Sequence, residues 1–307
     1  MVDVVGIGNA NIDIIMSVPH QAANDEKVLV NDLKELPGGG AANFIVGVTR
    51  QGHKGGFIGY VGNDFRGTVF KESLKKEGVD ISYLKQSDKY STGLALIING
   101  LDGTHVLYSY RGANSLLSEN DLNFGYIRDC KVFHLSSIKP SLLIAATEVR
   151  SKVDTKLSVD PGRNIAKVNV EEYQKDLQEI DILFMNRLEF SAFTGLELTK
   201  EHVVKIAKKF NLVLSVQNGA KGSIISDGKR VWKIDAFDVK VVDTTGAGDA
   251  YSAGFISGYL RGFDIKTCGI LGTATAAIKI QKLGGREGLP TLSELSNFLE
   301  ERKLRIF

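Results

Sequence analysis

Short runs of apolar residues alternate along this chain with longer stretches in which apolar residues recur every three or four positions. The short runs are typical of buried strands, and the longer stretches are typical of helices that pack one face against a sheet. In residues 41–51, for example, Ala42, Ile45 and Val46 fall on one face of a helix that Gly52 would end. Further strands are predicted at residues 1–7, 57–61, 131–135, 157–159, 181–185 and 212–216, and further helices at 141–151, 188–193, 249–261, 266–282 and 292–303.

The regular alternation of strands and helices predicts an α/β fold, a doubly wound and mainly parallel sheet flanked by helices. Two pairs of strand-like segments interrupt this alternation, and the second pair is joined by a hairpin turn at Asp102-Gly103. Because a buried parallel sheet does not readily take in four such strands, we expect them to form a small separate β-sheet. This sheet, made by about residues 12–36 and 92–111, would project as a lid from a single domain of residues 1–307. The four segments are residues 12–18, 27–36, 92–99 and 104–110.

The amino-acid composition indicates which kinds of partner and which cellular compartment to expect. The 307 residues include 38 Lys and Arg against 36 Asp and Glu, and this near balance gives no reason to expect a nucleic acid as partner. No apolar run approaches the roughly 20 residues that a membrane-spanning helix needs, and the first residues lack the basic start of a secretory signal. Cys130 and Cys268 stand apart without metal-binding spacing, as expected of reduced thiols in a cytoplasmic protein.

The segment DTTGAGD at residues 243–249 carries the clearest chemical signal. It follows a predicted strand at residues 238–242 and opens a predicted helix, and a Gly-Ala-Gly turn in this position leaves backbone amides pointing outward. Small side chains let a phosphate approach these amides, and the helix dipole adds partial positive charge. Asp249 lies beside this anion site, where it could take the proton from an attacking hydroxyl; alternatively, it only complements the helix dipole.

Three segments resemble the signatures of the ribokinase/PfkB family of carbohydrate kinases. The sequence DTTGAGDAYSAG is similar to the second signature, with Tyr251 in place of the usual Phe, and PGGGAAN and GYVGND in the first 64 residues are similar to the first. The resemblance spans nearly the whole chain. It implies an ATP-dependent kinase with an α/β domain and a β-lid, in which Asp249 is the catalytic base and the amides of Gly246, Ala247 and Gly248 form an anion hole.

Two other nucleotide-binding motifs are not supported by the sequence. Gly6 and Gly8 begin a GxGxxG pattern, but Asn11 stands where the third Gly is required, and a strand-like run follows instead of a helix. No GxxxxGK[ST] segment occurs, which excludes a P-loop kinase.

Asn186 and Glu189 follow the predicted strand 181–185, at the end of the strand where α/β folds bind ligands. Taken alone, an Asn and a Glu three residues apart are also typical of a helix cap. The family resemblance implies instead an NxxE motif that organises Mg²⁺ and its waters around the phosphates, and hydrated Mg²⁺ suits such oxygen ligands. It further implies nucleotide contacts by Asn186, Gln217, Gly219, Gly222 and Thr273.

Many members of the family also bind a monovalent cation such as K⁺ beside the anion hole. The resemblance implies that its oxygen ligands would come from Asp243, Thr245 and the loop at residues 282–288. The residues permit such a site, but ligands from the backbone leave no signature in a sequence.

Asn11 and Asp13 follow the first predicted strand and lie two residues apart, so their side chains point the same way if the chain stays extended. An amide and a carboxylate side by side can grip neighbouring sugar hydroxyls; the alternative for either residue is an Asx turn at a strand end. The Asn-x-Asp spacing resembles that of ribokinases, in which both residues contact a pentose. The resemblance adds Asn43 as a further hydroxyl contact, with Gly38 and Gly39 allowing close backbone approach and acting as the lid hinge.

The sequence departs from the ribokinase pattern at the acceptor end. Gly40 replaces a common Lys, and Ser136 or Ser137 stands where ribokinases carry an acidic contact, which could make room for a bulkier acceptor. The segments GGGAAN, LFMN and DPGRN are also similar to archaeal-type nucleoside kinases of the family. A nucleoside base would have to stack on the lid, and the aromatic residues considered for this contact are Phe44, Tyr108 and Tyr110.

Two arginines suggest a third class of acceptor. Arg111 ends the predicted lid hairpin, and Arg163 lies in a segment similar to one in keto-deoxy-sugar acid kinases. Either side chain could meet a carboxylate, and Arg163 could instead meet the γ-phosphate; solvent exposure is the simpler interpretation of both.

The sequence therefore predicts an ATP- and Mg²⁺-dependent kinase of the primary hydroxyl of a pentose such as ribose. The alternatives are a nucleoside kinase of the same family, a sugar-acid kinase, and a non-catalytic regulator that kept the fold. Lid-mediated dimers are frequent among relatives, and an exposed lid edge favours a partner, so we also expect a homodimer formed through the lid.

Overall fold

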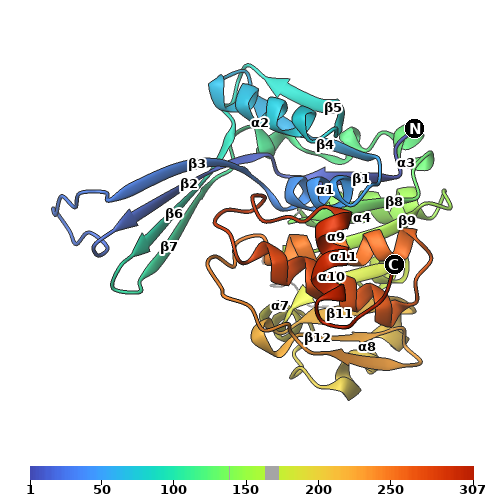
Figure 1. Cartoon of the computed structure of the whole chain (residues 1–307). Helices are drawn as coiled ribbons and strands as arrows, with labels where there is room; N and C mark the ends of the chain where they lie inside the picture. Colours follow the sequence, from blue (N-terminus) through green and yellow to red (C-terminus); the bar gives the residue numbers. More distant parts are fainter. Residues whose placement is uncertain (138, 163–172) are drawn as a thin grey trace.

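The computed structural model describes residues 1–137, 139–162 and 173–307. A nine-stranded sheet forms its centre, in the order β13-β12-β11-β10-β9-β8-β1-β4-β5 (Figure 1). All neighbouring pairs are parallel except β11–β12 and β12–β13. The strands are β1 (Val4–Gly8), β4 (Gly55–Gly62), β5 (Asp80–Ser87), β8 (Val132–Ser136), β9 (Lys156–Asp160), β10 (Ile182–Asn186), β11 (Val213–Gln217), β12 (Ser223–Ser226) and β13 (Val231–Ile234).

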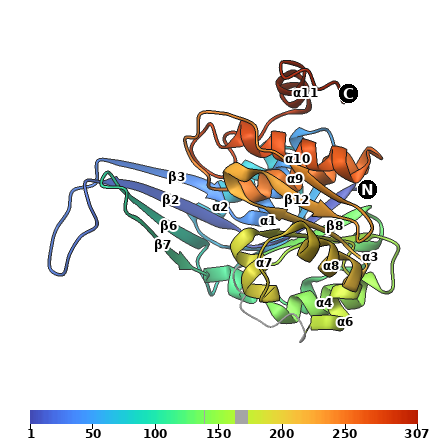
Figure 2. The same cartoon turned by 90° about the horizontal axis from the view of Figure 1, so that it is seen from below.

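Helices cover both faces of this sheet, as Figure 2 shows. One face carries α1 (Gly40–Arg50), α2 (Phe65–Lys76), α9 (Ala247–Leu260) and α10 (Ile265–Lys279), with α11 (Leu292–Glu300) packed outside α10. The other face carries α3 (Phe124–Arg128), α4 (Pro140–Arg150), α6 (Gln174–Gln178), α7 (Arg187–Thr194) and α8 (Lys200–Phe210). The predicted class, a doubly wound and mainly parallel α/β sheet flanked by helices, is confirmed.

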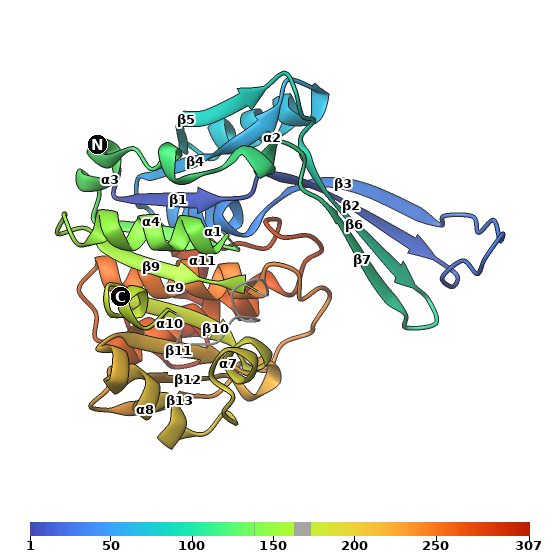
Figure 3. The same ribbon diagram turned by 180° about the vertical axis from the view of Figure 1, so that it is seen from behind.

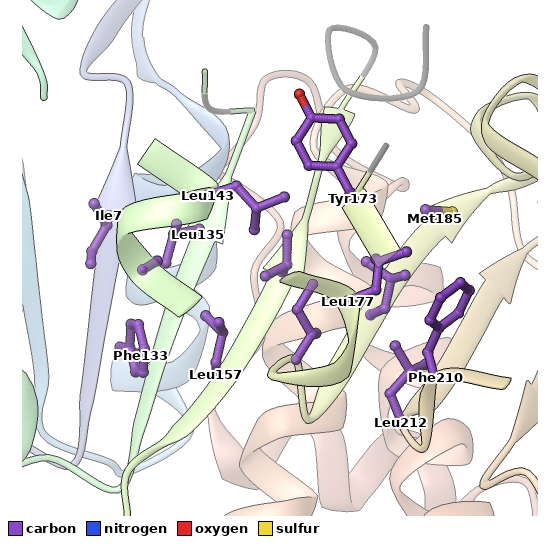
Figure 4. Close-up of a cluster of buried hydrophobic side chains, with 14 of the residues drawn as sticks. Ile7, Phe133, Leu135, Leu143, Leu157, Tyr173, Leu177, Met185, Phe210 and Leu212 are labelled. Carbon is purple, nitrogen blue, oxygen red and sulfur yellow. The ribbon is translucent and has the colours of Figure 1, made fainter. Parts of the chain in front are cut away.

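The core on this second face joins residues that are far apart in the sequence (Figure 4). Phe133 and Leu157 from neighbouring strands are fully buried, and Leu177 and Phe210 pack against the sheet from α6 and α8. Each such side chain contributes roughly 1.5–3 kcal/mol when it leaves water. The runs of apolar residues in the sequence are therefore strands buried on both faces.

A second sheet of four strands projects from the main body (Figures 1 and 3). It has the order β3-β2-β6-β7, with β2 and β6 parallel and the outer pairs antiparallel. Strand β2 begins only two residues after β1 ends. The second sheet therefore starts at the edge of the main sheet where the carboxyl end of β1 lies. The separate sheet is as predicted, and its role as a lid stays a prediction. The strands are β2 (Asn11–Val18), β3 (Asp32–Gly38), β6 (Gly93–Gly100) and β7 (His105–Tyr110).

Several predicted boundaries differ from the structure. The strand predicted at residues 238–242 is wrong, because this segment runs as a loop whose Val242 amide donates to the Ile280 carbonyl at the end of α10. The strand predicted at 27–36 begins only at Asp32. Helix α10 ends at Lys279 instead of continuing to residue 282.

The structure also describes the two cysteines and the lengths of the helices. Cys130 and Cys268 are both free thiols, as predicted, and both are buried. In the part of the chain that the structure describes, none of the helices has the length and apolar character required to cross a membrane.

Candidate active site

Two cavities lie where strands of the main sheet reach their carboxyl ends. The larger, about 770 Å³, is bordered by β10, β11, the start of α9 and the side of α10. The smaller, about 540 Å³, lies between the segment that follows β1 and the inner face of the second sheet. Asp160 and Glu189 line both cavities. Two ligands bound in these cavities would therefore meet beside the same pair of carboxylates.

The Gly-Ala-Gly turn forms the start of α9, as its sequence predicts. Gly246 adopts φ 74°, and a Cβ atom there would lie 2.8 Å from the Gly285 carbonyl oxygen, so glycine is required. The amides of Gly246 and Gly248 have no acceptor among the described residues, whereas the Ala247 amide donates to the Thr244 carbonyl over 3.1 Å. Two of the three predicted amides are thus free to meet an anion, and the third closes the turn.

Asp249 lies in the first turn of α9, is half-buried, and lines neither of the two cavities. Its Oδ2 atom accepts a hydrogen bond of 2.9 Å from Nδ2 of Asn43. Burial raises the pKa of Asp249, while the Asn43 hydrogen bond and the positive charges of Lys279 and Arg286 act in the opposite direction. The carboxylate is therefore desolvated and also held by an amide donor and two nearby cations.

Arg286 decides which way the Asn43 amide faces. The guanidinium is buried over the ring of Phe70, 5.0 Å from its centroid, and its Nε donates to Oδ1 of Asn43 over 3.0 Å. Its other nitrogens donate to the Ser73 hydroxyl and the Gly38 carbonyl. Because Arg has no acceptor, the Asn43 oxygen must face Arg286 and its nitrogen must face Asp249. The role of Arg286 is not predictable from the sequence, because a charge in a glycine-rich loop gives no sign of where its side chain lies.

Asp13 lies beside the glycines predicted to form the hinge. It is 6% exposed, and burial raises its pKa to about 6, with Arg286 opposing and the charges of Asp249 and Asp243 adding to the rise. A Cβ atom on Gly38 would lie 2.1 Å from the Asp13 carboxylate. Gly39 adopts φ 96°. Both glycines are therefore required, the first by the carboxylate that lies against it and the second by its own backbone angle.

Asn11 and Arg111 line the smaller cavity, as expected of acceptor contacts. The Asn11 Oδ1 atom accepts from Nδ2 of the buried Asn114 over 2.8 Å, which leaves the Asn11 amide nitrogen to face a ligand. Asn114 also bonds both backbone groups of Ala10. The sequence gives no sign of this partner, because Asn114 lies 103 residues away from Asn11 along the chain. Arg163 lies outside the described residues.

Asn186 and Glu189 form a reciprocal cap at the start of α7. The Asn186 side chain accepts from the amides of Leu188 and Glu189, and Glu189 Oε2 accepts from the Asn186 amide over 3.0 Å. The two residues therefore do form the helix cap that their spacing suggested. Both side chains also line the larger cavity, so the cap holds them at the position predicted for Mg²⁺ and nucleotide.

The other residues predicted to bind nucleotide line the same cavity. Gly219 and Gly222 adopt φ 55° and φ 81° in the short turn between β11 and β12. The Thr273 hydroxyl donates to the Gly269 carbonyl of its own helix, so it presents mainly its methyl group. The Nε2 atom of Gln217 is buried and has no acceptor among the described residues. The cavity-lining residues predicted from sequence are Asn186, Glu189, Gln217, Gly219, Gly222 and Thr273.

Asp160 is a further candidate that sequence reasoning missed, although it ends strand β9 just as Asn186 ends β10. Burial and the charges of Glu189 and Asp249 raise its pKa well above the usual range. In the described ranges, no group of three acidic, His or Cys side chains could hold a metal ion without other ligands. A site that combines one or two carboxylates with phosphate oxygens and water is the usual arrangement for Mg²⁺, and these residues fit it.

Asp243, predicted as a ligand of a monovalent cation, accepts hydrogen bonds from three groups of the protein. Its two carboxylate oxygens accept from the amides of Thr245 and Gly284 over 2.9 and 2.7 Å. Its carbonyl oxygen accepts from the buried ammonium of Lys279 over 3.1 Å. Burial works to raise the pKa of Asp243, but these amide hydrogen bonds outweigh it and lower the pKa.

Comparisons with known proteins agree with this geometry. Residues 1–292 match the model of the pfkB family carbohydrate kinases. The chain belongs to this family. It is 28% identical to a nucleoside kinase of Methanothermobacter thermautotrophicus, over 95% of this chain and 94% of that protein. It is 29% identical to a ribokinase of Haemophilus influenzae, over 96% and 97%. The structure of Arabidopsis thaliana ribokinase with ribose and ATP superposes with a TM-score of 0.87 at 25% identity, covering 97% of this chain and 99% of that one.

Membership of the pfkB family makes the chain a kinase of sugar or nucleoside hydroxyls. The structure corrects one expectation about its acceptor end. No space is gained at Gly40, because a Cβ atom there would lie 2.4 Å from the Ser136 hydroxyl and 3.0 Å from Asp249 Oδ1. Of the two serines, the exposed Ser137 lines the smaller cavity and Ser136 is buried.

The three aromatic residues considered as platforms for a nucleoside base are not available to this pfkB-family kinase in that role. Phe44 is fully buried and stacked on His134, with ring centroids 3.8 Å apart. Leu107 and Ser109 of β7 line the smaller cavity, so Tyr108 and Tyr110, which alternate with them, lie on the opposite face of the sheet.

Proposed function

We propose that this kinase transfers the γ-phosphoryl group of ATP to the primary hydroxyl of a pentose such as ribose, with Asp249 as the catalytic base. The observation that carries the proposal is the start of α9. There, the free amides of Gly246 and Gly248 lie next to a carboxylate that the Asn43 amide orients. A developing negative charge and the proton leaving the acceptor would each meet a preorganised partner.

In the proposed reaction, the nucleotide lies in the larger cavity and the sugar in the smaller one. Asp249 accepts the proton of the acceptor hydroxyl, whose oxygen forms a bond to the γ-phosphorus in line with the breaking bond to the β-phosphate oxygen. ADP leaves with the electron pair of that bond. The amides of Gly246 and Gly248 stabilise charge on the transferring group, and the Ala247 amide supports the turn that holds them.

Asn186, Glu189 and Asp160 are the groups that would hold Mg²⁺, whose charge offsets that of the phosphates. The position of Glu189 and Asp160 supports this assignment, because without a cation two carboxylates lining both cavities would repel the bound phosphates. Gly219, Gly222 and Thr273 would lie along the nucleotide, and Gln217 would border it at the end of β11.

The chemistry of the smaller cavity supports a sugar over a nucleoside. Its walls carry Asn9, Asn11, Ser109 and Ser137, which are groups that bond hydroxyls, and it has no aromatic lining residue in the described part of the chain. Asp13 and Asn43 extend this polar side toward Asp249. Arg111 supports a second candidate, a sugar that carries a carboxylate or a phosphate.

A panel of acceptors tests the proposal. ATP consumption would be measured with ribose, ribose 1-phosphate, 2-keto-3-deoxygluconate, cytidine, adenosine and inosine, and we expect the highest kcat/KM with ribose. Asp249→Asn should lower kcat by about 10²–10⁴-fold while nucleotide binding, measured by calorimetry, is kept. Turnover of nucleosides alone would replace the sugar proposal, and absence of turnover with every acceptor would favour a regulator.

A further inference from the structure

Lys279 is a buried cation to which the proposed reaction assigns no role. It is the last residue of α10, its side chain is 0% exposed, and its Nζ donates to the carbonyl oxygen of Asp243 over 3.1 Å. Burying an ammonium among neutral groups is costly, and burial lowers the pKa of Lys279, whereas the charges of Asp243 and Asp249 raise it. A buried lysine in such a place requires a reason that packing alone does not supply.

Three segments of the active site meet around this ammonium. The end of α10 accepts the amides of Val242 and Asp243 at the Ile280 carbonyl, which joins it to the turn before α9. The loop at residues 284–288 closes on the same point, since Gly284 donates to Asp243 and a Cβ atom on Gly288 would lie 2.4 Å from the Lys279 carbonyl oxygen. The Lys279 side chain therefore lies beneath the turn that presents the free amides.

The ammonium also acts on the acid groups of the reaction. Burial raises the pKa of Asp249, and Lys279 is one of the two cations that work against this rise. It likewise helps to keep the pKa of Asp243 low. A fixed positive charge below the turn would favour the ionised form of the base and add to the potential felt by a phosphate above the turn.

A second, diffusible monovalent cation does not fit here. Its expected ligands are Asp243, Thr245 and the loop at residues 282–288, but both carboxylate oxygens of Asp243 are turned to amides and its carbonyl already accepts from Lys279. A metal cation at this point would lie next to the like charge of the Lys279 ammonium in a buried site, where repulsion between charges is weakly screened. All three Asp243 oxygens that would bind such an ion therefore already have a donor from the protein.

We propose that the Lys279 ammonium is the built-in cation of the 243–248 turn and that the kinase consequently needs no monovalent metal ion. Lys279 is a positioning residue, since it acts on the reacting groups through the 243–248 turn and through its charge. The catalytic part of the proposal rests on the proposed kinase function, and its structural part concerns the turn itself.

The experiment compares wild type with Lys279→Ala and Lys279→Met in K⁺, Na⁺, NH₄⁺ and tetramethylammonium buffers of equal ionic strength. We expect the wild-type kcat and Tm to be the same in K⁺ and tetramethylammonium. Both variants should lose on the order of 10²-fold in kcat, the size of effect seen when a preorganised charge partner is removed, with little change in KM for ATP. The smaller Ala side chain leaves room for an ion, so K⁺ or NH₄⁺ should restore part of the kcat of Lys279→Ala and raise its Tm, but should not do so for Lys279→Met.

Lys266→Met is the matched control, because Lys266 is exposed on the same helix and should tolerate the change in every buffer. A wild-type enzyme that K⁺ stimulates several-fold over tetramethylammonium would overturn the proposal, as would Lys279→Met with normal kcat. If neither variant folds, the wild-type kcat in K⁺ compared with tetramethylammonium still tests whether the kinase needs a monovalent metal ion. If no acceptor in the panel is phosphorylated, the Tm measurements test the cation proposal separately, and a selective rise of wild-type Tm with K⁺ would contradict it.

Discussion

At the scale of single residues, the side-chain amide of Asn43 lies between Arg286 and the proposed base, Asp249. Asn43 can bond Asp249 through its nitrogen only because Arg286, which has donors alone, claims its oxygen. The same guanidinium bonds the Gly38 carbonyl at the hinge of the second sheet. Arg286 thus connects Gly38, at the end of β3 in the second sheet, with the orientation of the proposed base, without lining either cavity.

Replacing Arg286 should affect both the rate and its pH dependence. Arg286→Met removes a positive charge that opposes the raised pKa of Asp249, so the acidic limb of the kcat/KM profile should move to higher pH. We expect kcat to fall by about 10–100-fold through misorientation of Asn43. A full pH–rate profile measures both effects, and Arg128→Met, at an exposed site, is the control. An unshifted profile would mean that Arg286 has no electrostatic effect on the base.

Asp13, a proposed acceptor contact, should lower the free energy of unfolding at neutral pH, because its carboxylate is buried. Its folded-state pKa of about 6 exceeds the ordinary value of 3.8, so the folded protein loses stability as the pH rises through this window, and the loss is complete above it. Asp13→Asn should therefore raise the free energy of unfolding by about 2–3 kcal/mol at pH 7.5 and have much less effect at pH 4. Denaturant titration at both pH values measures this, and kcat/KM for the acceptor should fall. Equal effects at both pH values would contradict it.

At the scale of elements, the active site consists of the places where strands and helices begin and end. The start of α9 supplies free amides, the cap of α7 holds Asn186 and Glu189 at the end of β10, and the end of α10 brings Lys279 beneath the 243–248 turn. These are the positions where backbone groups lack partners within their own element, so they can be directed to a ligand or a loop.

Gly246 and Gly262, at the two ends of α9, provide a matched pair of substitutions. Both have positive φ, 74° and 78°, but a Cβ atom would clash with the Gly285 carbonyl only at Gly246 and would meet open space at Gly262. Gly262→Ala should cost about 1–2 kcal/mol in unfolding free energy with normal kcat. Gly246→Ala should cost more and lower kcat, because the turn must shift away from the 284–288 loop. Similar kcat for both variants would argue against a role for the turn.

At the scale of the whole molecule, the second sheet presents two different faces. The inner face borders the acceptor cavity, and the outer face carries Leu33, Tyr108 and Tyr110, which are 53%, 60% and 49% exposed. Both edges of this sheet, β3 and β7, lack a neighbouring strand among the described residues. An apolar face with open edges favours association, which is the reason we expect a homodimer.

The dimer prediction can be tested by light scattering after gel filtration. We expect wild type to elute as a dimer, and Tyr108→Lys to dissociate it by placing a charge on the outer face. Ile144→Lys, a similarly exposed position on α4, should leave the mass unchanged. A wild-type monomer at micromolar concentration would refute association through this sheet.

The pattern of apolar residues was enough to predict the parallel sheet, the separate small sheet and most helices, because periodicity directly reflects burial on one or both faces. The predicted strand at 238–242 failed, since its apolar residues Val241 and Val242 are exposed in a loop that bonds the end of α10. Local patterns do not reveal whether a short apolar run has a neighbouring strand to pair with.

The sequence alone determined the chemistry of the 243–249 segment, since small residues, a helix start and an acid are local properties. Only the tertiary structure decided which side chains complete the site. Arg286, Lys279, Asn114 and Asp160 come from distant parts of the chain, and their roles depend on contacts formed when those parts pack together. Charge and orientation in a buried site arise from three-dimensional neighbours, which have no counterpart in residue spacing.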